Sequence, residues 1–315
     1  MRHRPLRRNI SHLPAVIRLK AKTENTAMSN IHLQFGDNIR LTGPRAWADS
    51  VRGQLLVMMM FRTGHAVISE IWAARTHHVT IRPYPHADEN ADATGASARH
   101  ETPAGERIRD LDGSTMGTLR GSGRGTSSTV RYTPGRFRAD TTLRVPHLGL
   151  MRPGVVINGG DDQTVVLLHE LSHSLRSLYG ANESQAIRDA APGQGGGSPV
   201  NPLPRRFENT EELFAITVGN VFCSERHLAL RADHASVEGA GGVWQNQALQ
   251  VEEFWREPTI YRHLQSAIAR MPRLAQRLAS IDTAFNPFRE IQRGVRPRPR
   301  MVNAQGRVLD PYSAP

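Results

Sequence analysis

The chain has 315 residues, enough for one large domain or two small ones with a hydrophobic core. Its single cysteine, Cys223, excludes intramolecular disulfides and cysteine-rich zinc fingers, and we expect it to be a small buried side chain. No run of 18 apolar residues occurs, so the sequence predicts no membrane span.

The net charge of +11 is concentrated at the two ends of the chain. Residues 1–20 contain six basic residues and no acidic one, and residues 286–315 contain six arginines against two acidic residues. A nucleic-acid-binding fold would carry its charge on a folded face, so we expect no specific nucleic-acid partner. Residues 1–27 lack the apolar segment of a Sec signal peptide and are predicted to be a disordered basic leader, and 286–315 a basic extended tail.

The N-terminal part of the chain predicts a small sheet and two helices. Residues 31–35 and 39–41 alternate apolar and polar side chains around a Gly-Asp pair, which predicts a β-hairpin. Apolar spacing then predicts a helix over 47–58 with Gly64 as its stop, a second helix over 66–72 and a strand over 79–82.

Residues 84–140 change in character. They are polar, rich in Gly, Ser and Thr and poor in aliphatic side chains, so they cannot bury enough apolar surface to offset the entropy lost on ordering. We expect an irregular insertion on one domain, spanning 28–285, and not a second domain. Short extended pieces are predicted at 142–145 and 155–158.

The clearest helix in the sequence ends at Gly180. Asp161 or Asp162 is predicted to cap its start, and the glycine its end. Leucines three, four and three residues apart form one apolar stripe facing the core: Leu168, Leu171, Leu175 and Leu178. A Gly- and Pro-rich loop (191–206) and helices over 209–222, 248–269 and 272–283 are expected to follow.

Within that helix, His169-Glu170-Leu-Ser-His173 fits the metalloprotease pattern. A spacing of four places both imidazoles on one helix face, one turn apart, where both reach a single metal ion. Glu170 follows the first histidine directly, so we expect it to lean over a metal-bound water and to take its proton, which would leave a hydroxide to attack a carbonyl. The bland alternative is two surface histidines on an amphipathic helix.

Catalytic zinc has three protein ligands and an open position, so a third ligand must come from elsewhere. A compact HExxHxxGxxH site is excluded, because Arg176 occupies the position of its glycine and Tyr179 that of its third histidine. A glutamate at the start of the helix over 209–222 is the alternative: Glu212 is favoured over Glu211, with Glu208 behind. Acidic residues in a first helical turn also complement the helix dipole, which accounts for some of the three.

The motif segment from Thr164 to Gly180, together with the later Glu211-Glu212-Leu-Phe-Ala-Ile-Thr-Val-Gly, resembles the NleD-like type III effector zinc proteases. The resemblance implies an α+β, zincin-like single domain with a small N-terminal sheet and a helical core that carries the motif helix. It implies Zn²⁺ as cofactor and secretion into a host cell. It also implies cleavage of a host signalling protein in the cytosol, in some members a mitogen-activated protein kinase.

Two questions stay open at this point. Tyr179, His227, Arg231 and His234 are candidates for stabilising the oxyanion, and the sequence does not rank them. A zinc-containing binding protein that docks nucleic acid or acidic surfaces through its basic tails is the alternative function.

Overall fold

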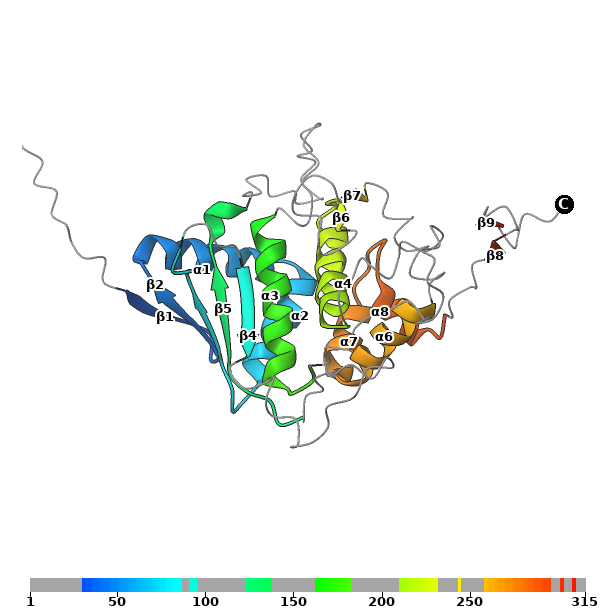
Figure 1. The fold of residues 1–315 in the computed structure, drawn as a ribbon, viewed down its shortest axis with the longest axis horizontal. Coiled ribbons are helices and arrows are strands. Elements are labelled where there is room, and N and C mark those ends of the chain that lie inside the picture. Colours follow the sequence, from blue (N-terminus) through cyan, green and yellow to red (C-terminus); the bar gives the residue numbers. More distant parts are fainter. Residues whose placement is uncertain are drawn as a thin grey trace, which may run out of the picture.

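The computed structural model describes residues 30–86, 91–95, 123–137, 162–182, 210–231, 243–244, 258–295, 301–302 and 308–309. Over these residues the protein is a mixed α+β fold, as expected. A sheet lies on one side of the molecule, helices α3 and α4 lie side by side in the middle, and the C-terminal helices α6, α7 and α8 lie on the other side (Figure 1).

The main sheet has five strands in the order β1-β2-β3-β5-β4. The three inner strands are parallel, and the two end strands, β1 and β4, are antiparallel to their neighbours. The bounds of these strands are Ile31–Phe35 (β1), Ile39–Gly43 (β2), Val79–Arg82 (β3), Ala91–Gly95 (β4) and Ser128–Tyr132 (β5).

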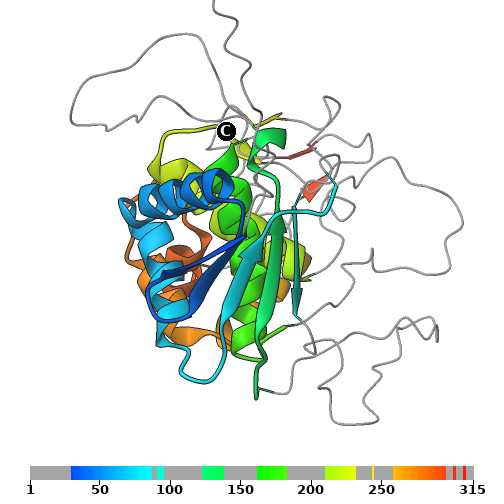
Figure 2. The ribbon, with the colours of Figure 1, turned by 90° about the vertical axis from the view of Figure 1, so that its left-hand side faces the viewer.

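One face of the sheet is buried because apolar side chains alternate along the inner strands and lie in register. Ile39 pairs with Val79, and Leu41 pairs with Ile81, which in turn pairs with Val130; all five are fully buried. Helices α1 and α3 pack on the sheet, and in Figure 2 α1 (blue) lies above the sheet while α3 (green) lies behind it.

The helices run from Arg45–Met59 (α1), Arg62–Ala73 (α2), Gln163–Leu178 (α3), Thr210–Glu225 (α4), Pro258–Ala269 (α6), Pro272–Ala279 (α7) and Pro287–Gln292 (α8). A 3-10 turn, Pro134–Arg136 (η1), follows β5, and two-residue strands pair as Leu230–Arg231 (β6) with Val243–Trp244 (β7) and Met301–Val302 (β8) with Val308–Leu309 (β9). The predicted hairpin, the helices at 47–58, 66–72 and 209–222, and the strand at 79–82 are confirmed to within a few residues.

The prediction that Gly64 ends the first helix is wrong. The helix ends at Met59, and Gly64 lies in the first turn of α2. A Cβ at this position would lie 2.4 Å from the Met58 carbonyl oxygen, so glycine lets α2 begin directly against the end of α1.

The segment 84–140 is not irregular throughout. It contributes β4 and β5, and β5 pairs with β3 inside the sheet. The glycines that suggested disorder fit against the end of α3: a Cβ on Gly125 would clash with the Leu178 carbonyl, and Gly123 N–H donates to the Gly180 carbonyl at 3.0 Å. Glycine here permits close packing, which composition alone does not reveal.

The C-terminal part also differs from the prediction, because the tail from 286 begins with a helix. The Asn286 side chain caps α8 by accepting from Arg289 N–H, Pro287 occupies its first turn, and Phe288 is fully buried against Phe214. The helix expected at 272–283 ends at Ala279. Of the helix expected at 248–269, only α6 lies within the described residues.

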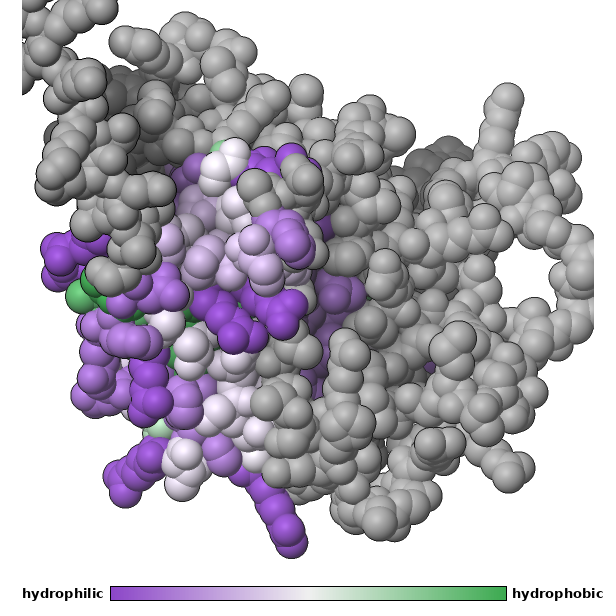
Figure 3. Space-filling view, turned by 60° about the vertical axis from the view of Figure 1, so that its left-hand side comes forward, coloured by the Kyte–Doolittle hydropathy of each residue, from purple (hydrophilic) through white to green (hydrophobic). Residues whose placement is uncertain are grey.

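The leader (1–27), the pieces at 142–145 and 155–158, and the loop at 191–206 lie outside the described residues. Among the helices that are described, none is both long and apolar enough to cross a bilayer. Large hydrophobic side chains that are exposed in the described ranges are Leu56, Met60 and Val295. Accordingly, the face drawn in Figure 3 carries only small hydrophobic areas among its described residues.

Candidate metal centre

Helix α3 is buried on nearly every side. Asp162 caps its start, accepting from the backbone N–H groups of Thr164 and Val165 at 2.9 and 3.0 Å, and Gly180 follows its end with φ +57°. The four predicted leucines are all buried in the core, and His169 is only 4% exposed. The interpretation of the motif as two surface histidines is therefore wrong.

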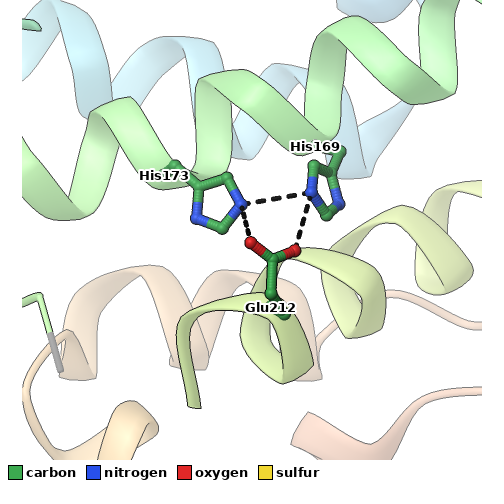
Figure 4. Close-up of side chains that lie close together, drawn as sticks. All are labelled: His169, His173 and Glu212. Carbon is green, nitrogen blue, oxygen red and sulfur yellow. Dashed lines mark hydrogen bonds and ion pairs between the residues drawn. The ribbon is translucent and has the colours of Figure 1, made fainter. Parts of the chain in front are cut away.

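The two motif histidines meet a glutamate from α4 (Figure 4). Their Nε2 atoms are 3.1 Å apart, and the Glu212 carboxylate bridges them, with Oε2 at 3.2 Å from His169 Nε2 and Oε1 at 3.4 Å from His173 Nε2. This trio is the group of potential metal-binding side chains found among the described residues, and it could hold a metal ion.

The spacing between the two imidazole nitrogens, and between each nitrogen and its nearest Glu212 oxygen, fits the ligands of a tetrahedral ion. Ligands at about 2.0–2.1 Å from a zinc ion, separated by the tetrahedral angle, lie about 3.3 Å from one another. The three distances of 3.1, 3.2 and 3.4 Å enclose that value. Two imidazole nitrogens and one carboxylate oxygen also form the donor set of hydrolytic zinc sites, whereas calcium and magnesium prefer oxygen ligands.

The structure brings Glu212 to the histidines and turns Glu211 away. Glu211 instead contacts the buried guanidinium of Arg176, with its two carboxylate oxygens 2.9 and 2.8 Å from Arg176 Nε. Glu208, the third candidate, lies outside the described residues. The face of α4 that carries Glu212 is also the face that packs on α3, where Gly219 lies against Val165.

His169, His173 and Glu212 shift one another's pKa values. Burial lowers the pKa of His169 to about 3, despite its hydrogen bond to Glu212. For His173 burial acts in the same direction, but the charge of Glu212 and its hydrogen bond outweigh it and raise the pKa to about 9. Burial opposes ionisation of Glu212, yet His173 and His169 hold its pKa far below the ordinary value. The metal-free centre thus carries one proton at neutral pH, at the place where a cation would bind.

Glu170 lies next to this group without belonging to its ligands. It is 9% exposed, and its negative charge contributes to the raised pKa of His173. The Glu170 carboxylate is therefore close enough to His173 for its charge to act on that imidazole.

Three of the four candidates for stabilising the oxyanion lie within the described residues, and their positions distinguish them. The Tyr179 hydroxyl donates to the Glu70 carbonyl in α2, and His227 is exposed beyond the far end of α4, which lies about 20 Å along the helix from Glu212. Arg231 is 7% exposed, and its charge acts on His169. His234 lies outside the described residues.

Arg231 reaches this region because Asn220 holds its backbone against α4. The Asn220 side chain donates to the Arg231 carbonyl at 2.8 Å and accepts from its N–H at 2.7 Å. Sequence reasoning missed this contact and the pairing of Arg176 with Glu211. The available signal for the second was the position of Arg176, seven residues after His169 and therefore on the same face of α3 as that histidine.

Comparisons with known proteins add no identification: no protein-family model matches the chain, and no curated protein matches it significantly.

Proposed function

We propose that the chain is a zinc-dependent endopeptidase in which His169, His173 and Glu212 hold the ion and Glu170 is the general base. The observation that carries the proposal is the close grouping of two imidazole nitrogens and the Glu212 carboxylate: the nitrogens lie 3.1 Å apart, and one carboxylate oxygen lies 3.2 Å from His169 Nε2 while the other lies 3.4 Å from His173 Nε2. When bound, zinc lowers the pKa of a coordinated water to about 7 and polarises the carbonyl that is attacked.

Glu170 and Arg231 supply the remaining chemistry. The Glu170 carboxylate accepts the proton of the attacking water and returns it to the amine nitrogen as the C–N bond breaks. The guanidinium of Arg231, whose charge reaches His169, stabilises the negative charge that develops on the carbonyl oxygen. Both side chains are mostly buried, so their charges are weakly screened by solvent.

An extended peptide is the substrate class that the neighbouring sheet favours. Strand β4 is an end strand of the main sheet and packs against α3, the helix of the metal centre. An end strand offers backbone hydrogen-bonding groups to which an extended chain adds. A sheet with this strand beside the motif helix also supports a zincin-like fold. A host signalling protein as substrate, and type III secretion as the route to it, remain predictions of the sequence resemblance alone.

The proposal is tested with zinc-loaded protein and a mixture of peptides whose new termini are mapped. We expect wild type to cleave, and Glu170→Gln to bind zinc equally but to cleave about 10³-fold more slowly. Glu225→Gln, at the opposite end of α4 from Glu212, is the control and retains activity. Zinc-loaded wild type without peptidase activity, or full activity in Glu170→Gln, would refute the assignment.

A further inference from the structure

Two buried ion pairs join α3 to α4, one at each end of the helices. Arg176, near the end of α3, pairs with Glu211 at the start of α4, and its Nη2 lies 2.8 Å from Glu211 Oε1. Arg226, just after α4, pairs in bidentate fashion with Asp162, the cap of α3, at 2.9 and 3.1 Å. The helices are therefore antiparallel, and they lie side by side in Figure 1.

The guanidinium of Arg176 is held from several directions. Besides Glu211, it donates to the carbonyls of Ala181 at 2.6 Å and Ala267 at 3.3 Å, and it stacks 4.6 Å over the ring of Phe214. Arg176 is 0% exposed. Its planar fork thus has one orientation, and it fixes where the Glu211 carboxylate lies.

Glu211 and Glu212 are consecutive, so their side chains leave α4 about 100° apart. Only one of them can face His169 and His173 for a given rotation of the helix. We propose that Arg176 is a positioning residue of the metal centre: by holding Glu211, it fixes the rotation of α4 that makes Glu212 the carboxylate facing the two histidines. This inference rests on the proposed function, because it concerns how the same centre is built.

A purely stabilising role explains the pair less well. Moving two charges out of water is costly, and a buried ion pair often stabilises a fold no more than apolar side chains of similar volume. Its geometric precision is what apolar side chains cannot reproduce, because a bidentate arginine defines both the distance and the plane of the carboxylate.

The pair of Arg226 and Asp162 is a matched control. It has the same chemistry, is equally buried and joins the same helices, but it lies about 21 Å along α4 from Glu212. A role limited to holding the helices together predicts that loss of either pair has the same consequence for the centre. A positioning role predicts that only the loss of Arg176 and Glu211 changes it.

The experiment compares two double variants of the full chain, Arg176→Met/Glu211→Gln and Asp162→Asn/Arg226→Met, in which no buried charge is left unpaired. Zinc affinity is measured by competition with a chelator, the thermal midpoint by calorimetry, and the coordination geometry by the visible absorption of bound Co²⁺. We expect the first variant to bind zinc about 10- to 100-fold more weakly and to give an altered Co²⁺ spectrum. The second should stay within about threefold of wild type, whatever its midpoint.

Arg176→Lys provides a milder test should the first double variant not fold. It keeps the buried charge balanced but loses the bidentate fork, so it should also weaken zinc binding and alter the Co²⁺ spectrum. Wild-type affinity and spectrum in the Arg176 variants, or equal losses in both double variants, would overturn the positioning role while leaving the metal centre intact. Wild type that binds no zinc would instead refute the proposed function, and this inference with it.

Discussion

The affinity of the centre for zinc should rise steeply with pH. The pKa of His173 is raised to about 9 by Glu212 and that of His169 is lowered to about 3 by burial, so one proton occupies the metal-free trio at pH 7. Zinc binds deprotonated imidazoles and must displace that proton. The apparent dissociation constant should fall about tenfold per pH unit from pH 7 to pH 9, about 100-fold in all, and level off above.

Two measurements check this prediction. Chelator competition at pH 7, 8 and 9, corrected for protonation of the chelator, gives the slope. Calorimetry in two buffers with different ionisation enthalpies counts the protons released, which should be about one per zinc ion at pH 7. An affinity that does not change over this interval, with no proton released, would refute the electrostatic account of the trio.

The same shifts determine the pH dependence of the metal-free protein. Because the folded pKa of His173 lies above its unfolded value of about 6.5, its contribution to stability is complete below that pH and is lost as the pH rises through about 9. His169 acts in the opposite way, since its lowered pKa removes stability as the pH falls below about 6.5. The thermal midpoint of the metal-free protein should therefore decrease both as the pH falls below about 6.5 and as it rises through about 9. Calorimetry between pH 5 and pH 10 would show both decreases. A midpoint that stays constant from pH 7 to pH 10 would contradict the assignment for His173.

Further substitutions test the fold and the site. Gly64→Ala should destabilise the fold by about 1–3 kcal/mol, because the new Cβ meets the backbone of α1. Gly53→Ala, which has open space around it in α1, should stabilise the fold by up to about 1 kcal/mol. Equal midpoints of the two variants in thermal unfolding would contradict this reasoning. Glu225→Ala removes the carboxylate that accepts from two backbone N–H groups at the start of α2 and should lower the unfolding free energy by about 1 kcal/mol, while Asp49→Ala, which breaks an exposed ion pair, should change it by less than about 0.5 kcal/mol. Arg231→Met should lower kcat at least about tenfold with zinc still bound, and an unchanged kcat would remove Arg231 from the mechanism.

The motif helix was predictable because its signals are local. The Asp162 cap, the terminal Gly180 and the spacing of four between His169 and His173 depend only on helix geometry, and all three are found. Helix geometry alone did not decide which glutamate is the third ligand. Glu211 and Glu212 occur in the same helical turn, and the choice between them depends on Arg176, a partner 35 residues away from Glu211.

The sheet shows the opposite case, where a local signal misled. Residues 128–132 alternate buried and partly buried side chains as a strand should, but they follow a glycine-rich run typical of disordered segments. In the folded protein, Gly125 and Gly180 make close contacts with the segment opposite that a Cβ would prevent. Composition does not distinguish a glycine needed for close packing from one in a flexible linker, because the difference lies in the tertiary neighbour.

Metal binding by the full chain tests the central claim most directly, with zinc stoichiometry and affinity compared in four proteins. Wild type and Glu170→Gln should bind one equivalent with the same affinity to within about threefold, whereas His169→Ala and Glu212→Gln should each weaken binding by more than the roughly 100-fold that loss of an outer partner costs. If wild type bound no zinc, or if Glu212→Gln bound it as tightly as wild type, the trio of His169, His173 and Glu212 would not be a metal centre.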